Sequence, residues 1–128
     1  MVRLVLFLSI SLFCYHANAI SKCEELYLNS KTGSLEKYKY LIKQYFNGDN
    51  RVKNIYIQNV IKDGDWLIIN ASTDITDPAY FFFKNNKYID VWAGVIFPEE
   101  KNNTLKWTQE KKVPRDLANC FIDSITIK

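Results

Sequence analysis

Residues 52–73, VKNIYIQNVIKDGDWLIINAST, decide the fold of this 128-residue chain. They consist of two segments rich in Ile, Val, Tyr and Trp, the residue types that are enriched in β-strands. Asp63-Gly64 lies between the segments and is a preferred dipeptide of the type I′ hairpin turn, whose two central residues need a positive φ. The stretch therefore predicts an antiparallel hairpin made of residues 52–62 and 65–73.

A second hairpin is expected a few residues further along the chain. Residues 80–84 and 87–95 are again rich in aromatic and β-branched side chains. Asn85-Asn86 between them can form the turn, because Asn tolerates a positive φ. Residues 74–78 are expected to connect the two hairpins, which together predict a four-stranded antiparallel sheet.

An amphipathic helix is expected before the sheet, over residues 35–46. Ser34 is a suitable N-cap, and Asn47-Gly48 is a suitable C-terminal end. Nearer the N-terminus, the capping-box spacing of Ser21 and Glu24 predicts a short helix that reaches about residue 29. The apolar stripe of the longer helix consists of Leu35, Tyr38, Leu41, Ile42, Tyr45 and Phe46.

Further helices are expected after the sheet. Residues 104–112 form a weakly amphipathic helical pattern, and Pro114 suits the first position of a second helix. Residues 124–128 alternate between polar and apolar, which fits either a terminal strand or a frayed tail. The whole pattern predicts an α+β fold in which the N-terminal helix and the C-terminal helices pack on the four-stranded sheet.

The first nineteen residues have the three parts of a secretory signal peptide. Met1-Val2-Arg3 gives a positive start, residues 4–13 an apolar run, and Ala17-Asn18-Ala19 a cleavage site of small residues. We expect cleavage after Ala19, a single domain of residues 20–128, and a periplasmic or extracellular location. The apolar run is about half of the ~20 residues that a membrane span needs, so no membrane anchor is expected after cleavage. Bacterial and eukaryotic secretion both fit the sequence.

Two cysteines, Cys23 and Cys120, remain once the leader is removed together with Cys14. An oxidising compartment favours their pairing, so we expect a disulfide that joins the two ends of the domain. For a closed loop of roughly 100 residues, chain-entropy estimates give about 4–5 kcal/mol of stabilisation.

The domain contains few of the groups that catalyse reactions. His16, the only histidine, lies in the leader, which excludes His-dependent nucleophilic sites and His-based zinc sites from residues 20–128. The glycines are isolated, so no phosphate-binding loop is expected, and we predict no catalytic residue, metal or other cofactor. The 16 basic and 14 acidic residues that remain without Arg3 are scattered, which argues against nucleic-acid binding.

Neither face of the predicted sheet is polar. In the first hairpin, strict alternation places on one face the side chains of Ile55, Ile57, Ile61, Trp66 and Ile68. In the second hairpin, it groups Phe81, Phe83, Tyr88, Asp90 and Trp92. A sheet with one wet side shows alternating apolar and polar residues, so two arrangements fit this pattern. Either helices cover both faces, or one face is a pocket or a surface for a partner.

These observations favour an exported, non-catalytic protein that binds another protein, such as an inhibitor or immunity protein against a hydrolase or toxin. The predicted contact residues are Lys87, Tyr88, Asp90 and Trp92, because aromatic residues dominate protein interfaces. One alternative is a carrier of a small apolar ligand, with an aromatic pocket between the sheet and the helix of residues 35–46. The other is a carboxylate-dependent polysaccharide hydrolase, in which Asp90 is the candidate acid. The oligomeric state stays open.

Overall fold

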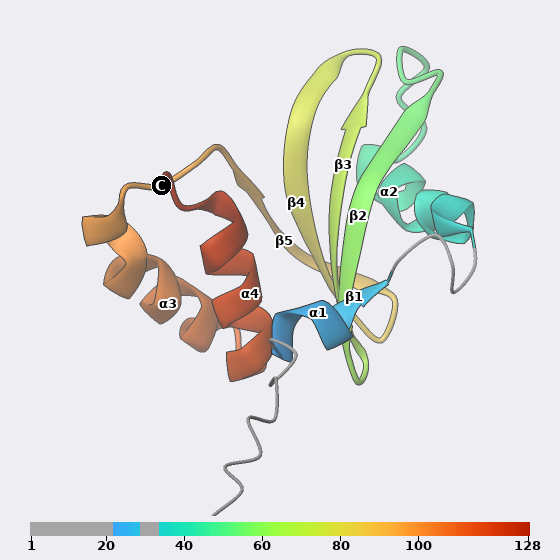
Figure 1. The fold of residues 1–128 in the computed structure, drawn as a ribbon. Coiled ribbons are helices and arrows are strands. Elements are labelled where there is room, and N and C mark those ends of the chain that lie inside the picture. The colour runs from blue at the N-terminus through green and yellow to red at the C-terminus, as the bar shows by residue number, and fades with distance from the viewer. Residues whose placement is uncertain (1–21, 29–33) are drawn as a thin grey trace, which may run out of the picture.

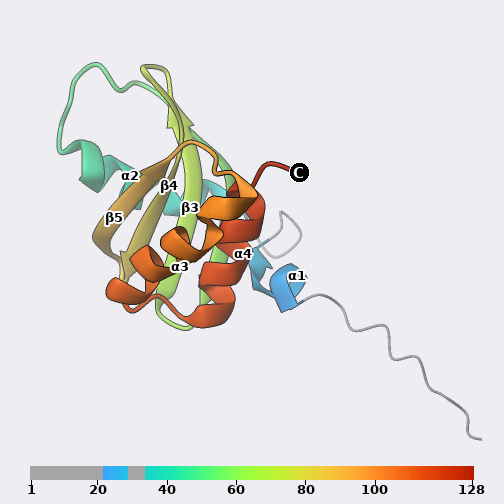
Figure 2. The same ribbon diagram turned by 90° about the vertical axis from the view of Figure 1, so that its left-hand side faces the viewer.

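A computed structural model describes residues 22–28 and 34–128 of the chain (Figure 1). The predicted signal peptide, residues 1–19, and its cleavage site lie outside these residues. The described part is an α+β structure built on one antiparallel sheet, with strand order β1-β2-β3-β4-β5. Helix α2 lies on one face of the sheet, and α3 and α4 lie on the other (Figures 1 and 2). No helix in this part of the chain is long and apolar enough to cross a membrane.

The sheet has five strands, one more than the sequence predicts. The additional strand is β1 (Tyr27–Leu28), which pairs with β2 (Ile55–Asp63). The predicted first helix therefore ends early, as α1 (Lys22–Leu26). Local helix propensity is weak enough for tertiary contacts to override, and here the chain gains strand pairing at the edge of β2 instead of one more helical turn.

The central strands form a continuous meander of β2, β3 (Trp66–Thr73), β4 (Thr76–Lys84) and β5 (Lys87–Ala93). The expected connector of residues 74–78 is instead a tight turn followed by the start of β4. The Thr73 and Thr76 hydroxyls lie 2.9 Å apart across this turn, and the Ile75 N–H donates to Thr73 Oγ1 at 3.2 Å. Pro78 is tolerated within β4 because the β3–β4 register shifts opposite it, between Ala71 and Thr73.

The two hairpin turns differ from each other. Asn85 and Asn86 have φ values of 51° and 61°, as a type I′ turn requires. In the first hairpin Asp63 pairs with Trp66, so the turn residues are Gly64-Asp65 and not Asp63-Gly64. Only Gly64, with φ of 57°, is in the left-handed region, the pattern of a type II′ turn with Gly in first position.

Helix α2 and the turn before it cover one face of the sheet. The 3₁₀ turn η2 (Leu35–Tyr38) leads into α2 (Lys39–Phe46), and Ser34 Oγ accepts a hydrogen bond from the Glu36 N–H at 3.1 Å. The predicted helix is therefore confirmed in position, with its first turn wound more tightly. Its buried residues Tyr38, Leu41 and Ile42 belong to an apolar cluster with Val60, Leu67, Ile69, Phe81 and Phe83.

The other face is covered mainly by α4 (Arg115–Ile125), which begins one residue later than predicted, because Pro114 is its N-cap and not its first helical residue. Ahead of it lies α3 (Lys101–Glu110), the helix expected over residues 104–112, which begins three residues earlier and ends two residues earlier than predicted. The 3₁₀ turn η3 (Pro98–Glu100) leads into it. The C-terminal segment makes one parallel bridge, Thr126 with Ile96, and no longer strand. The apolar cluster under α4 includes Ile61, Ile68, Phe82, Leu117, Phe121 and Ile125.

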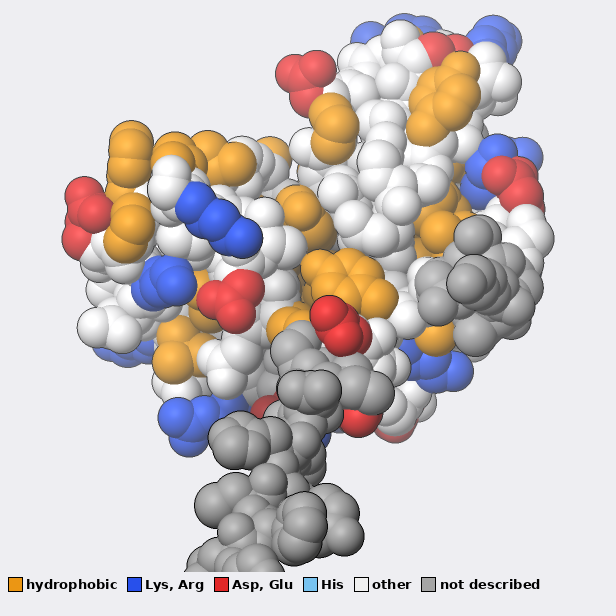
Figure 3. All heavy atoms as spheres, in the orientation of Figure 1, with side chains coloured by type: hydrophobic (Ala, Val, Ile, Leu, Met, Phe, Trp, Pro, Cys, Tyr) orange, Lys and Arg blue, Asp and Glu red, His pale blue; other side chains and the backbone are white. Residues whose placement is uncertain are grey.

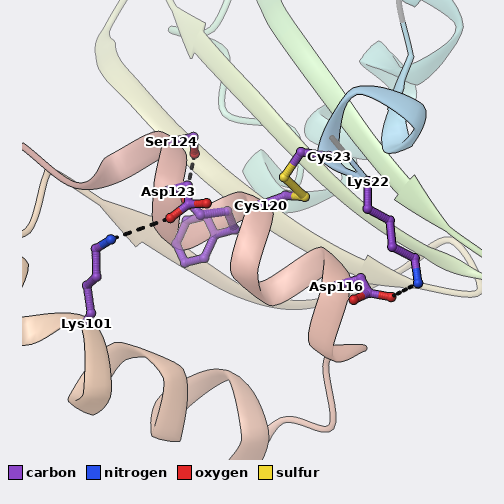
Figure 4. Close-up of a disulfide and its surroundings, with 8 residues drawn as sticks. Lys22, Cys23, Lys101, Asp116, Cys120, Asp123 and Ser124 are labelled. Carbon is purple, nitrogen blue, oxygen red and sulfur yellow. Dashed lines mark hydrogen bonds and ion pairs between the residues drawn. A yellow bond between two sulfur atoms is a disulfide. The ribbon is translucent and has the colours of Figure 1, made fainter. Parts of the chain in front are cut away.

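The predicted disulfide joins Cys23 of α1 to Cys120 of α4 (Figure 4). The two residues are 97 positions apart in sequence, and their Cα atoms lie 5.4 Å apart. Beside the bridge, Lys22 Nζ lies 2.8 Å from Asp116 Oδ2, and this ion pair also joins α1 to α4 (Figure 4). The N-terminal end of the described domain is therefore fixed to the C-terminal helix.

Candidate functional site

Two register shifts in the sheet change which side chains share a face. The first lies in β2 between Ile57 and Asn59, where Gln58 is an extra residue relative to β3. An extra residue reverses the alternation beyond it. As a result Ile55 and Ile57 pack towards α2, whereas Ile61 packs towards α4. The sequence prediction that these three isoleucines share a face is wrong for this reason.

The second shift lies in β5 and divides the predicted contact residues. Tyr88 pairs with Phe83 and Asp90 with Phe82, so Ile89 is the extra residue. Since paired residues point to the same side, Tyr88 lies on the face covered by α2. Asp90 and Trp92 lie on the face covered by α3 and α4, contrary to the common face that strict alternation predicts. Lys87 is exposed opposite Lys84, at the end of the hairpin.

Trp92 belongs to the core on the α4 side. Its ring centroid lies 5.1 Å from that of Trp107 and 6.2 Å from that of Phe121, both in edge-to-face arrangements. Such pairs stabilise a fold by packing as well as by burial. The structure therefore places Trp92 where it contributes to stability, and not on an open surface.

Asp90 is held on both of its carboxylate oxygens. Oδ2 lies 2.7 Å from Lys111 Nζ, and Oδ1 accepts a hydrogen bond from the Val91 N–H at 2.8 Å. Partial burial raises the pKa of Asp90, but the hydrogen bonds from Lys111 and Val91 outweigh it, so the pKa lies below its usual value. A general acid needs a raised pKa, which is the opposite of what surrounds this carboxylate.

The same contacts protect the edge of the sheet. In the described part of the chain β5 has a strand on one side only, and its other edge is free (Figure 2). Unpaired N–H groups on such an edge invite a strand from another chain, and charged side chains and bulges discourage it. Asp90 occupies the Val91 N–H, and the extra residue Ile89 interrupts the strand. These features disfavour recognition by strand addition at β5.

Tyr88 lies beside an open apolar groove on the α2 side, which we call the tyrosine groove. Its volume is about 310 Å³, and it is lined by Tyr45, Phe46, Thr76, Asp77, Pro78, Ala79, Phe81, Val91 and Ala93. Tyr88 does not line the groove but contacts a residue that does, since its ring centroid lies 5.0 Å from that of Tyr45. The two tyrosines are 39% and 38% exposed, and Tyr45 also contacts Phe81 at 5.0 Å between ring centroids. Partial burial, with Tyr45 and Asp90 nearby, raises the pKa of Tyr88, so its phenol stays neutral at ordinary pH.

Sequence reasoning identified Tyr88 but missed Tyr45 as an accessible residue. The apolar stripe of residues 35–46 predicts that all its members are buried in the core. Helix α2 is only eight residues long, and its last turn borders the open groove, so Tyr45 there is only partly covered. The tyrosine at this end of the stripe is a weak signal, since its hydroxyl favours an exposed position.

A second group of exposed apolar residues lies near the C-terminus. Val95, Phe97 and Ile127 are 67%, 56% and 42% exposed, and hydrophobic side chains gather on this end of the molecule (Figure 3). The adjacent groove is lined by charged residues as well as apolar ones, namely Pro98, Lys101, Asp123, Thr126, Ile127 and Lys128. The tyrosine groove is therefore the more apolar of the two large grooves.

Residues 22–28 and 34–128 contain no cluster of three or more His, Cys, Asp or Glu side chains that could hold a metal ion. The grooves described above are open to the surface, and neither is an enclosed cavity. The groups that the tyrosine groove presents to a ligand are therefore mainly apolar side chains, together with tyrosine and threonine hydroxyls.

No protein-family model, curated protein or solved structure matches this chain.

Proposed function

We propose that this protein is an exported, non-catalytic binding protein that holds another protein through the tyrosine groove. One observation carries the proposal: an apolar groove of about 310 Å³ lies open between α2 and β5, with Tyr45 and Tyr88 exposed at its side. Tyrosines beside an apolar pocket are typical of the central contacts of protein interfaces. We favour a hydrolase or a toxin as the partner, and we propose that this contact inhibits it.

The lining of the groove indicates the chemistry of the partner. Phe46, Phe81 and Val91 suit one large apolar side chain that projects from a folded surface. Asp77 also lines the groove and forms no ion pair with any residue in the described ranges. A Lys or Arg beside the apolar side chain of the partner complements this carboxylate.

The test uses a substitution that fills the groove without removing core packing. Ala93 is exposed and lines the groove, so Ala93→Arg is expected to block it while the fold stays intact. Asn103→Arg, on the exposed side of α3, adds the same charge elsewhere and serves as the control. Partners captured from the extracellular or periplasmic fraction are identified, purified and titrated by calorimetry against all three proteins.

We expect a captured partner to bind Ala93→Arg at least about 30-fold more weakly than the parent, a loss of roughly 2 kcal/mol that is typical of an interface hot spot. Asn103→Arg is expected to bind as the parent does. Equal binding by the two variants, or capture of no partner that titrates with the parent protein, would contradict the proposal.

A second candidate function, transport of a small apolar ligand, draws on the same groove, since α2 and the sheet enclose it from two sides. Carrier sites usually bury most of the ligand surface, and this groove is open. Titration with 8-anilinonaphthalene-1-sulfonate distinguishes the two functions. Saturable binding of one dye molecule that Ala93→Arg abolishes would favour the carrier. We do not propose a polysaccharide hydrolase, because Asp90 is already bound to Lys111.

A further inference from the structure

A second groove lies beside α2, on the side of β2, and its lining is basic. We call it the lysine groove: its volume is about 140 Å³, and it is lined by Lys39, Lys43, Val52, Lys53, Asn54 and Ile55. Lys39 and Lys43 are one helical turn apart on α2, and Lys53 lies in the segment that leads into β2. Three ammonium side chains from two separate segments therefore share one small depression.

The charges in this groove are incompletely neutralised within the described residues. Lys39 Nζ lies 2.7 Å from Glu36 Oε2, but neither Lys43 nor Lys53 forms an ion pair there. The Asp74 carboxylate accepts from the Lys53 backbone N–H, at 3.1 and 3.2 Å, and lies beyond ion-pair distance of its ammonium group. Like charges at positions i and i+4 of a helix repel each other, so an anion in the groove relieves an unfavourable arrangement.

The backbone that carries these side chains is well held. Leu41 and Ile42 fix α2 to the sheet and are fully buried. The Asp74 hydrogen bonds fix the backbone at Lys53, and Ile55 is buried at the base of the groove. Asn54 also lines the groove, and its side-chain amide carries N–H donors. The backbone that carries the donors is therefore ordered before any ligand binds, which lowers part of the entropic cost of binding.

We propose that the lysine groove binds a phosphate group. Lysine binds phosphate as a compact point charge, and a phosphate monoester carries about −1.5 to −2 charges at neutral pH with three acceptor oxygens. That charge matches the two lysines without a carboxylate partner, whereas a carboxylate ligand would neutralise only one of them. The phosphate comes either from a free phosphate compound in the surroundings of the protein or from a phosphorylated lipid headgroup. The proposal is independent of the tyrosine groove and its partner.

The test is an NMR titration of the disulfide-bonded protein with sodium phosphate, at constant ionic strength maintained with sodium chloride. The double variant Lys43→Gln with Lys53→Gln removes the two unpaired charges. The control Lys62→Gln with Lys106→Gln removes the same net charge from exposed positions on β2 and α3. Saturable shifts at residues 39–43 and 52–55 are expected in the parent and the control, with affinity about tenfold lower in the first variant.

Vesicles distinguish the two sources of phosphate. Co-sedimentation is measured with phosphatidylcholine vesicles that contain 20% phosphatidic acid, and with pure phosphatidylcholine. A headgroup ligand is identified if the parent and the control bind the mixed vesicles and the Lys43/Lys53 variant does not. This conclusion holds even where free phosphate binds too weakly to saturate. Saturation by free phosphate without vesicle binding identifies a soluble ligand. The proposal fails if neither probe binds, or if both variants lose binding equally, since net charge alone would then explain the result.

Discussion

The two faces of the sheet are covered to different extents. On the α4 face, α1, α3 and α4 lie together over the strands, and a disulfide and an ion pair link α1 to α4. On the α2 face, the eight-residue α2 and the short turn η2 provide the helical cover. On the first face Phe82, Trp92, Trp107 and Phe121 pack against one another. On the second face Tyr45 and Tyr88 remain more than one third exposed.

This difference indicates a division of roles. Each face carries a buried apolar core, and the α4 face adds the covalent link and the ion pair. The α2 face leaves one apolar groove and one basic groove beside a single helix, and so provides surface for ligands. Substitutions in the aromatic core of the α4 face should therefore lower stability, whereas substitutions at the exposed groove residues beside α2 should mainly alter binding.

The largest effect is expected from removal of the disulfide. Replacement of Cys23 and Cys120 by Ala opens a loop whose ends are 97 residues apart, and chain-entropy estimates for such loops give a loss of about 4–5 kcal/mol. The free energy of unfolding of the parent and the variant is measured by urea denaturation, with circular dichroism as the signal. A loss below about 1 kcal/mol would show that the fold on the α4 face holds α1 without the covalent link.

The next largest effect is expected from Phe121→Ala at the centre of the α4 face. Phe121 is fully buried, and its ring packs against Tyr80, Phe82, Trp92 and Trp107. Truncation of a buried Phe leaves a cavity and typically costs about 3–5 kcal/mol. Urea denaturation with the disulfide intact measures this loss, and the tyrosine-groove variant Ala93→Arg, which changes no buried residue, should unfold within about 0.5 kcal/mol of the parent.

Tyr45→Ala should have a smaller effect on stability, of about 1 kcal/mol. Its ring is partly exposed, and the substitution removes contacts with Phe46, Phe81 and Tyr88 without opening the sealed core. If denaturation shows a loss as large as that of Phe121→Ala, Tyr45 is part of the core and not of a binding surface, and the division of roles is wrong. Partner binding should still fall in this variant, which separates binding from stability.

The parts of the fold that could be predicted from sequence depend on local signals. Ser34 begins the N-terminal helix region and Asn47, with φ of 39°, ends it, because capping depends on neighbouring backbone groups. The disulfide follows from cysteine count and compartment. By contrast, β1 forms through pairing with a strand more than thirty residues away in sequence, so no local sequence pattern predicts it.

The candidate site was only partly predictable, for a different reason. An extra residue at Ile89 reverses the alternation in β5, so Tyr88 and Asp90 point to opposite faces. Nothing in the residue types around Ile89 marks this position, since a bulge is stabilised by what packs on each side of the strand. The sequence therefore indicated Tyr88 as a candidate contact residue, but the prediction grouped it with Asp90 and Trp92, which lie on the opposite face of the sheet.

The smallest effect on stability, and the sharpest test of the edge of the sheet, is expected from Asp90. The pKa of this carboxylate is lowered in the folded state, so the stability that it contributes is present above its usual value of 3.8 and is lost as the pH falls towards the folded-state pKa. Because the ion pair with Lys111 is about one third exposed on the Asp90 side, the contribution is below about 1 kcal/mol. Denaturation curves of the parent and Asp90→Ala should therefore differ slightly at pH 6, and the difference should shrink as the pH is lowered below 3.8.

Removal of the same carboxylate also exposes the Val91 N–H on the free edge of β5. Asp90→Ala is therefore expected to self-associate at concentrations where the parent does not, because an unguarded edge pairs with a second copy. Light scattering after size-exclusion chromatography measures this directly. Lys111→Ala removes the ion pair but keeps the Asp90 hydrogen bond to Val91, so it should leave the oligomeric state unchanged. Equal association of both variants would show that the ion pair, and not the covered N–H, keeps the edge of β5 unpaired.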